Sequence, residues 1–305
     1  MSEPIPPPLP APAPCGALTP EPTADGSFTL FSEDFGEWFH SRTGAYTEAH
    51  TTYVEATDLA TLAQAEALTG LDVCYGLGYN TAAALTTVQR VNPQCRVDMV
   101  GLELDGRVPR QAVDAGWVDR WSPEVQRILA QLAHQGRGEG PFLRAELRLG
   151  DARQTIQTFA QKGFQADVIF FDPFSPPHCP ELWTVDFIQQ VAHCLGPQGK
   201  LATYSCAAAV RTAFLAAGLH IGPIAAAGRR WPGTLAQWSP EGLTPLSPQE
   251  QDHLQTRAAV PYRDPSLQDT AAAIRHRRQQ EQAQSPLAPT SQWRKRWLPT
   301  AKPQG

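Results

Sequence analysis

Residues Leu71–Asn80, which read LDVCYGLGYN, decide the fold of this 305-residue chain. The run begins with the residues of a strand end, and Gly76 and Gly78 follow after a single tyrosine. Glycine adopts positive φ without strain, and a helix that begins near Thr81 would offer free N–H groups to a ligand. The third glycine of the dinucleotide fingerprint and the Lys-Ser/Thr pair of a P-loop are both missing. The stretch therefore predicts strand, turn and helix, and its turn either binds a ligand or is simply tight.

Strand-like and helix-like segments alternate after this turn. Helical stretches of roughly 10–15 residues separate the apolar runs, which is the pattern of βαβ units and a parallel sheet covered on both faces. We predict an α/β, Rossmann-like, doubly wound and mostly parallel sheet of seven strands that ends in an antiparallel hairpin. The strand-like runs after the first are 97–103, 144–149, 167–171, 200–204, 220–224 and 234–238.

The two ends of the chain differ in composition from its centre. The first 22 residues hold nine prolines, which deny the backbone both donors and helix, so we expect a Pro-rich disordered arm over residues 1–26. The folded domain is expected over 27–240. Residues 241–305 are rich in Pro, Gln, Ser and Arg, with one plausible helix over 265–284, and we expect a solvated appendage there.

Composition excludes several classes of protein. With 42% hydrophobic and 18% charged residues the chain is not disordered as a whole. No run approaches the roughly 18 apolar residues of a membrane helix, and the N-terminus lacks a secretory pattern, so we expect a cytoplasmic protein that binds no membrane. The six cysteines have no CxxC or His-pair spacing, so we expect neither a metal nor a disulfide framework.

The charge is unevenly distributed along the chain. The net charge is −5, but residues 1–26 contribute −3 and residues 273–305 contribute +6, which leaves −8 for residues 27–272. A protein that holds nucleic acid by phosphate neutralisation alone has a broad basic surface, and this one does not. Any contact with nucleic acid phosphates would have to come from a small, local group of basic residues.

Acidic residues follow the second and third predicted strands. Glu103 stands 25 residues after Gly78, where an acid accepts hydrogen bonds from the hydroxyls of a ribose. Asp151 follows Gly150 and suits an adenine amino group, although Asp is also a favoured N-cap for the helix beginning at Ala152. Because ligands bind beyond the carboxyl ends of such strands, these residues predict a nucleoside site without a pyrophosphate clamp. That combination favours S-adenosylmethionine over NAD, and hence a class I methyltransferase.

The fourth predicted strand ends in the segment with the most chemical character, Asp172-Pro173-Phe174-Ser175-Pro176. It resembles the Asn/Asp-Pro-Pro-Tyr/Phe loop of methyltransferases that act on amine nitrogens. An amine attacks a methyl group only when its lone pair is unprotonated and aimed, and a carboxylate can accept its hydrogens and its proton. Asp172 would do this with a backbone carbonyl of Asp172 or Pro173, and Phe174 would provide a flat apolar wall. The alternative is an aspartate that caps the turn.

These segments together resemble the methyltransferase domain of the bacterial bifunctional tRNA wobble-uridine enzymes of the MnmC type, which also occurs as free-standing proteins. The likeness covers roughly residues 25–240, and the loop at Asp172 followed by Pro180-Glu181-Leu182-Trp183 is its most specific part. Its other parts are Asp25-Gly26-Ser27, Glu48-Ala49-His50, Tyr53, Gly76-Leu77-Gly78-Tyr79-Asn80, Glu103, Gly150-Asp151, Gly196–Ser205 and Val210-Arg211.

This resemblance implies methylation of the exocyclic amine of 5-aminomethyluridine, or its 2-thio form, at the tRNA wobble position. It assigns catalysis to Asp172, with Pro173 and Phe174 against the substrate. The residues it places at the cofactor are Asp72, Gly76, Gly78, Asn80, Glu103 and Asp151. The tRNA anticodon loop is the expected partner, and Arg229, Arg230 and the basic tail would contact its phosphates.

The chain also departs from the family pattern. The family usually has glycine where Cys74 stands, and its basic segment near the end of the domain is represented only loosely by Gly228–Gly233. No second glycine-rich fingerprint follows, so we expect no FAD-dependent oxidase domain in this chain.

Two other functions remain open. The first is a methyltransferase or aminopropyltransferase that acts on a small amine, although an aminopropyltransferase often places two acids around its diamine and only Asp172 is evident. The second is a non-catalytic scaffold whose Pro-rich arm and basic tail recruit partners. A scaffold has no need of acids at three successive strand ends, which disfavours it.

Overall fold

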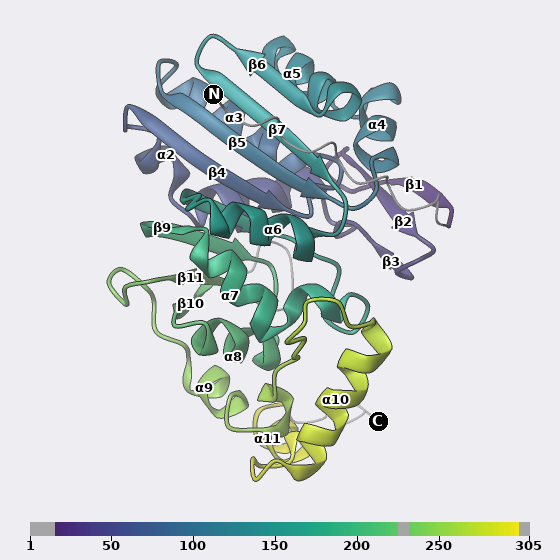
Figure 1. Cartoon of the computed structure of the whole chain (residues 1–305), viewed down its shortest axis with the longest axis vertical. Helices are drawn as coiled ribbons and strands as arrows, with labels where there is room; N and C mark the ends of the chain where they lie inside the picture. The colour runs from purple at the N-terminus through teal and green to yellow at the C-terminus, as the bar shows by residue number, and fades with distance from the viewer. Residues whose placement is uncertain (1–15, 225–231, 299–305) are drawn as a thin grey trace, which may run out of the picture.

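The computed structural model describes residues 16–224 and 232–298, and within them a central sheet of eight strands in the order β10-β11-β9-β8-β4-β5-β7-β6 (Figure 1). Strands β7, β5, β4, β8 and β9 run parallel, and β10 and β11 form an antiparallel hairpin that joins β9. The predicted doubly wound, mostly parallel sheet is therefore confirmed. The strands are β4 (Ala67–Val73), β5 (Arg96–Glu103), β6 (Arg137–Gly140), β7 (Leu143–Leu149), β8 (Ala166–Phe171), β9 (Leu195–Thr203), β10 (His220–Ile224) and β11 (Gly233–Gln237).

The predicted number of seven strands is wrong by one. The eighth strand, β6, has the sequence Arg-Gly-Glu-Gly and pairs antiparallel with β7 at the edge of the sheet. It contains no apolar residue, so no hydrophobic pattern marks it, and its pairing depends on the short hairpin to β7.

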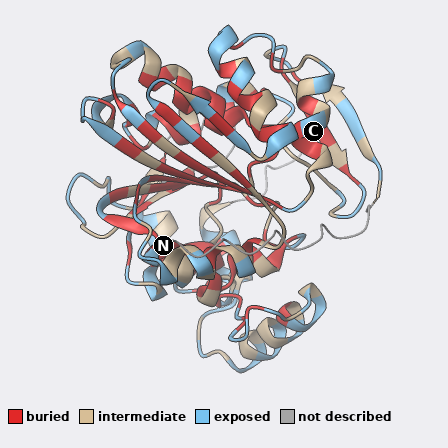
Figure 2. Ribbon diagram, turned by 45° about the horizontal axis from the view of Figure 1, so that its top comes forward, coloured by how far each residue is buried: buried red, intermediate tan, exposed pale blue. Residues whose placement is uncertain are grey.

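Helices cover both faces of the sheet, because successive strand residues point to opposite faces. Leu68 and Met99 pack into one core and Leu71 and Leu102 into the other. Figure 2 shows the central strands buried along most of their length between these layers. One layer holds α1 (Ala45–Glu48), the π-helical η1 (Ala49–Glu55), α2 (Leu59–Leu62), α3 (Tyr79–Val91), α4 (Arg107–Asp114) and α5 (Pro123–Gln135), and the other holds α6 (Ala152–Gln161), α7 (Val185–His193) and α8 (Ala208–Ala216).

A second, three-stranded antiparallel sheet precedes these layers, made of β1 (Leu18–Pro22), β2 (Phe28–Ser32) and β3 (Glu37–Trp38). The expected disordered arm over residues 1–26 is thus wrong from Leu18 onward, and residues 1–15 lie outside the described part. Strand β1 tolerates Pro20 and Pro22 because it is an edge strand, where a missing N–H breaks no central ladder.

The C-terminal extension is folded, which corrects the expected solvated appendage. It contains α9 (Pro248–His253), the 3₁₀ turn η3 (Arg257–Ala259), α10 (Ala271–Gln284) and α11 (Thr290–Trp297), which lie at one end of the molecule beside α8 (Figure 1). Ile274 is fully buried and Trp293 is 8% exposed. The 3₁₀ turn η2 (Pro180–Trp183) contacts α10. No helix among the described residues is long and apolar enough to cross a membrane.

Candidate active site

A cavity of about 590 Å³ lies beyond the carboxyl ends of β4, β5, β7 and β8, within the usual size range of ligand pockets. The order of strands reverses between β4 and β8, and a doubly wound sheet binds its ligands at such a switch point. Five of the predicted site residues line this cavity, while Asp72, Gly78, Asn80 and Pro173 are not among its lining residues. The five are Gly76, Glu103, Asp151, Asp172 and Phe174.

The turn after β4 has the left-handed backbone that its glycines permit. Gly76 has φ 56° and Gly78 has φ 85°. A Cβ on Gly78 would lie 2.6 Å from the Tyr75 hydroxyl, so only glycine fits there. Cys74 also has a positive φ of 68°, in a region that non-glycine residues seldom adopt.

Glu103 ends β5 with its side chain directed at this turn. Its carboxylate accepts hydrogen bonds from the N–H groups of Gly76 at 2.8 Å and Asp105 at 2.9 Å. Burial raises the pKa of Glu103 to about 7, although these hydrogen bonds oppose the shift. The neighbouring Asp105 instead forms an ion pair at 2.6 Å with Arg107, the first residue of α4.

Asp72 lies behind the cavity rather than on its wall. It is fully buried and accepts a hydrogen bond from the Thr81 hydroxyl at 2.7 Å, which ties the end of β4 to the first turn of α3. Burial raises the pKa of Asp72 to about 7. Any effect of Asp72 on a ligand would thus pass through the glycine turn that it supports.

The loop after β8 is joined to the same turn. The Asn80 side-chain amide donates to the Asp172 carboxylate at 3.1 Å, which connects a residue that the sequence places at the cofactor with the predicted catalytic acid. The Tyr204 hydroxyl donates to the carbonyl of Pro173 at 2.8 Å, and the Trp183 indole donates to the carbonyl of Phe174 at 2.7 Å. These bonds fix the loop backbone on both sides of the acid.

An aromatic wall closes one side of the cavity, and two of its members were not predicted. Phe174 stacks on Phe35 with ring centroids 4.5 Å apart and meets Phe39 edge-on at 4.7 Å. The Glu37 carboxylate accepts a hydrogen bond from the N–H of Ser175 at 2.8 Å, which attaches β3 to the loop. The only local signal for this contact is the dense aromatic run over residues 35–39.

Asp151 is the N-cap of α6 and also lies on the wall of the cavity. Its carboxylate caps α6 by accepting the N–H of Arg153 at 2.9 Å. The Arg153 guanidinium pairs with it at 2.8 Å. The two predicted phosphate contacts, Arg229 and Arg230, lie outside the described residues.

Two cysteines, Cys74 and Cys179, also line the cavity. Burial raises the pKa of both thiols, so they are protonated near neutral pH and are poor nucleophiles. Across residues 16–224 and 232–298 no group of three or more His, Cys, Asp or Glu side chains is placed to hold a metal ion.

The set of acceptors fits an adenosyl cofactor. The carboxylates of Glu103 and Asp151, at the ends of β5 and β7, line the cavity as hydrogen-bond acceptors, and the glycine turn allows close approach of a ligand. A sulfonium cation is compatible with this acid-lined cavity, because Arg107 and Arg153 on the same wall are already paired with carboxylates.

Comparison with known proteins agrees with this geometry. The family model for an S-adenosyl-L-methionine-dependent methyltransferase matches residues 116–239. The crystal structure of MNMC2 from Aquifex aeolicus superposes with a TM-score of 0.77 at 30% identity, over 90% of this chain and 88% of that one. An uncharacterized protein of Methanocaldococcus jannaschii, MJ0670, is 29% identical over 83% of this chain and 69% of its own length.

Longer relatives match the same region. The tRNA 5-methylaminomethyl-2-thiouridine biosynthesis bifunctional protein MnmC of Burkholderia vietnamiensis is 25% identical over 69% of this chain. The match covers 33% of that protein, so the chain spans about a third of the bifunctional relative. The structural match extends over most of both chains, and the family model and the site geometry agree with it. This chain belongs to the MnmC-type S-adenosylmethionine-dependent methyltransferases.

Proposed function

We propose that this enzyme methylates the exocyclic amine of 5-aminomethyluridine, or its 2-thio form, at the wobble position of tRNA. The observation that carries the proposal is that Asp172 and Phe174, on one loop, line the same cavity as Glu103 and Asp151. An acid for an amine and acceptors for a nucleoside therefore share one space. Relatives that match this chain are named for biosynthesis of the 5-methylaminomethyl-2-thiouridine of tRNA.

In this proposal the protein aims and deprotonates the amine. Bound S-adenosylmethionine supplies the electrophilic methyl group. The Asp172 carboxylate, oriented by Asn80, accepts a hydrogen of the amine so that the nitrogen lone pair points at the methyl carbon. Methyl transfer would leave S-adenosylhomocysteine, and Asp172 would accept the proton that the methylated nitrogen loses and pass it to solvent.

The remaining residues bind the two partners of the reaction. Glu103 accepts from the ribose hydroxyls of the cofactor and Asp151 from its adenine amino group, while Gly76 and Gly78 leave room for its backbone contacts. The uracil base lies against the apolar aromatic wall of Phe35, Phe39 and Phe174.

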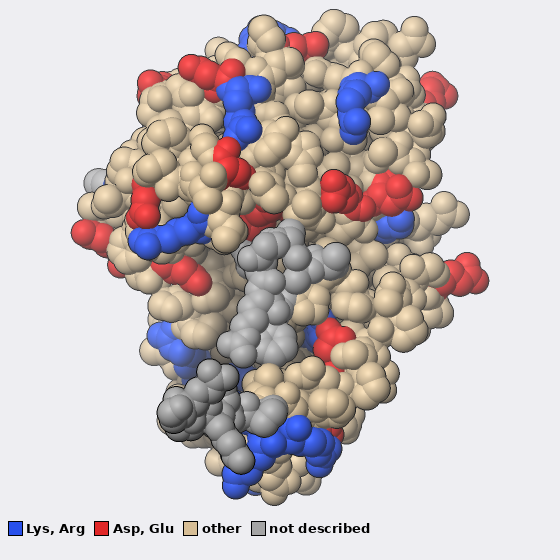
Figure 3. All heavy atoms as spheres, turned by 180° about the vertical axis from the view of Figure 1, so that it is seen from behind, with Lys and Arg blue, Asp and Glu red and all other residues tan. Residues whose placement is uncertain are grey.

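The basic tail has fewer cations available for phosphate than its composition suggests. Arg277 pairs with Asp269, Arg296 pairs with Asp252, and Arg278 donates to the carbonyls of Val260 and Ala258. The exposed pair Arg294 and Lys295 on α11 has no such partner among the described residues. Figure 3 shows Lys and Arg gathered at the end of the molecule where the C-terminal helices lie. We assign the local contact with tRNA phosphate to this pair, together with Arg229 and Arg230.

A small amine is the second candidate substrate, for either methyl or aminopropyl transfer. It is favoured by the net charge of −8 over residues 27–272 and by the internal contacts of Arg277, Arg278 and Arg296. A free amine would need the Asp172 loop and the aromatic wall but no basic surface.

The test is transfer of labelled methyl from S-adenosylmethionine to bulk tRNA from cells that lack this enzyme, followed by mass spectrometry of the nucleosides. A new 5-methylaminomethyluridine species, absent with Asp172→Ala, supports the proposal. If S-adenosylmethionine binds by calorimetry and no nucleoside gains a methyl group, the tRNA substrate is wrong and the small amine takes its place.

A further inference from the structure

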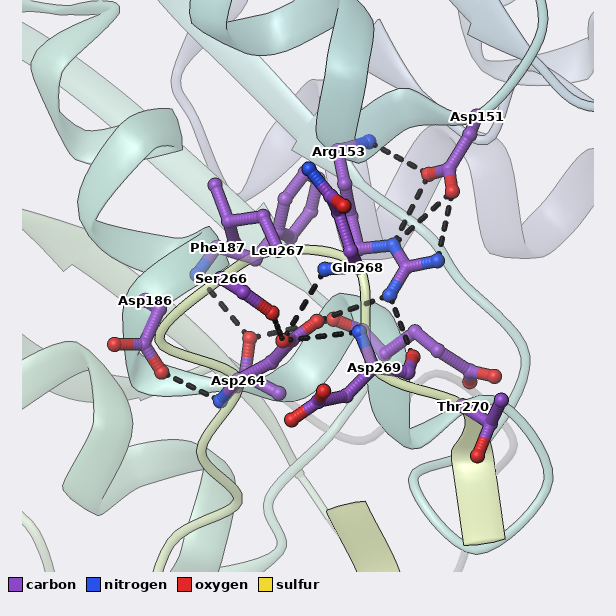
Figure 4. Close-up of polar contacts among 12 residues, drawn as sticks. Asp151, Arg153, Asp186, Phe187, Asp264, Ser266, Leu267, Gln268, Asp269 and Thr270 are labelled. Atoms are coloured by element: carbon purple, nitrogen blue, oxygen red, sulfur yellow. Dashed lines mark hydrogen bonds and ion pairs between the residues drawn. The ribbon is translucent and has the colours of Figure 1, made fainter. Parts of the chain in front are cut away.

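Arg153 joins the cofactor side of the cavity to the C-terminal extension (Figure 4). Its guanidinium donates to the Asp151 carboxylate through Nε at 3.1 Å and Nη2 at 2.8 Å. The same group donates through Nη1 to the Asp264 carboxylate at 2.9 Å and to the Asp269 carbonyl at 2.9 Å. The Arg153 side chain is only 13% exposed, so one largely buried cation connects two acids that are 113 residues apart in the sequence.

Asp264 is the buried anchor of this arrangement. Its side chain has no exposed surface, and its second carboxylate oxygen accepts from the Ser266 hydroxyl and from the N–H groups of Gln268 and Asp269, each at 3.2 Å. A charge that is buried this completely is stable only when it is paired and hydrogen-bonded. Arg153 supplies the counter-charge.

The segment that carries Asp264 is itself attached near the Asp172 loop. The N–H of Val185 donates to the Tyr262 carbonyl at 3.0 Å, and the N–H of Asp264 donates to the Asp186 carboxylate at 2.6 Å. Arg275 of α10 donates to the Pro177 carbonyl at 3.0 Å. Arg153 is therefore held from the side opposite Asp151 by a segment that is fixed in place.

We propose that Arg153 is a positioning residue for the adenine of the cofactor, and that Asp264 of the C-terminal extension holds it in that role. A planar guanidinium that meets a carboxylate through two donors fixes both its distance and its plane. The Asp151 carboxylate is thereby kept in the single orientation in which it faces the cavity. This inference rests on the role given to Asp151 under the proposed function, and it makes the extension a part of the cofactor site.

The decisive variant is Asp264→Asn. The asparagine amide oxygen can still accept from Ser266, Gln268 and Asp269. Its NH₂ group cannot accept a hydrogen bond from Arg153, and the substitution removes the negative charge that pairs with Arg153. Asp252→Asn is the matched control, because it breaks another carboxylate–arginine pair of the same extension, to Arg296, without touching Arg153.

The readout is binding by calorimetry of S-adenosylhomocysteine and of its analogue that has hydrogen in place of the 6-amino group. A positioning role predicts that Asp264→Asn lowers the preference for the amino form by roughly three- to tenfold, the scale of one weakened hydrogen bond, and leaves the affinity for the analogue unchanged. Asp252→Asn should leave both affinities as they are in the wild type. Equal loss for both ligands, or no loss for either, overturns the inference.

Two further variants keep the test decisive. If Asp264→Asn does not fold, Arg153→Lys replaces it, because lysine keeps the charge but cannot bridge both acids, and the same selective loss is expected. Asp151→Ser keeps a capping hydroxyl for α6 but has no carboxylate. If Asp151→Ser does not reduce the preference for the amino form, the assignment of Asp151 itself fails. If Asp151→Ser reduces the preference for the amino form but neither Asp264→Asn nor Arg153→Lys does, the assignment of Asp151 stands and only the role of Arg153 is wrong.

Discussion

Asp172 and Glu103 line the same cavity, but their surroundings predict opposite effects of their removal. Asp172→Ala should reduce turnover by at least about 100-fold, the scale of general acid–base catalysis, and leave the affinity for S-adenosylmethionine within a few-fold. Glu103→Ala should weaken cofactor binding by about 1–3 kcal/mol, because hydrogen bonds to a charged group are lost. Steady-state kinetics and calorimetry on both variants measure the two effects separately. The reverse pattern would exchange the two assignments.

Asp72 gives the stability of the protein a specific dependence on pH. Its pKa rises from 3.8 to about 7 because it is buried, so the folded protein holds a proton that the unfolded chain has released. Between these pKa values the folded state binds more protons, and the free energy of unfolding falls as the pH rises. Asp72→Asn should therefore lose less stability than the wild type between pH 5 and 8, by on the order of 2 kcal/mol.

Denaturant unfolding at several pH values measures this difference. Asp98→Asn is the control, because Asp98 lies on β5 in an exposed ion pair with Arg144. Glu103 also has a raised pKa and stays in the variant, so part of the slope should persist. Parallel curves for Asp72→Asn and the wild type would show that Asp72 is ionised in the folded protein.

Residues that end strands could be predicted from the sequence, and residues that act across the fold could not. Glu103 ends β5, and Asp151 and Asp172 closely follow β7 and β8, so the topology of a parallel sheet places all three at one edge. Phe35 contacts Phe174 and Arg153 contacts Asp264 across more than 100 residues of sequence, and no local pattern encodes such contacts. The contact of Asn80 with Asp172 depends on the β4–β8 pairing, so the sequence alone could not predict it.

At the scale of elements, β3 holds the loop that carries Asp172 through one hydrogen bond. Glu37→Ala removes the acceptor for the N–H of Ser175, so the loop loses one of its fixed points. We expect the KM for the methyl acceptor to rise by roughly three- to tenfold, the cost of one hydrogen bond, with little change in cofactor affinity. Glu33→Ala is the control, since Glu33 accepts from the N–H of Ala17 beside the ends of β1 and β2, away from the loop. Equal effects of the two variants would mean that the whole sheet, rather than this contact, supports catalysis.

The elements that the sequence missed share a physical cause. Strand β6 and strand β1 lack an alternating apolar pattern, and each exists because a neighbouring strand pairs with it. The C-terminal extension has few apolar residues to mark a core. Its attachment combines a few apolar side chains that enter the core, Tyr262, Leu267 and Ile274, with buried polar contacts such as that of Asp264 with Arg153. Hydrophobic periodicity identifies elements that bury an apolar face. It does not identify elements that are held mainly by strand pairing or by ion pairs.

For the whole molecule, the uneven charge makes a prediction about tRNA. If contact with phosphate is confined to a few cations at the end where α11 lies, removing two of them should change the salt dependence markedly. Arg294→Ala combined with Lys295→Ala should lower the slope of log affinity against log salt by about one to two, and weaken binding at low salt. Filter binding of tRNA over a series of salt concentrations measures this slope. Arg90→Ala with Lys162→Ala removes the same charge from exposed positions on α3 and at the end of α6, so it should leave the slope unchanged. Equal slopes for the two double variants would mean that net charge governs the association, and the basic end of the molecule would then have no specific place in tRNA binding.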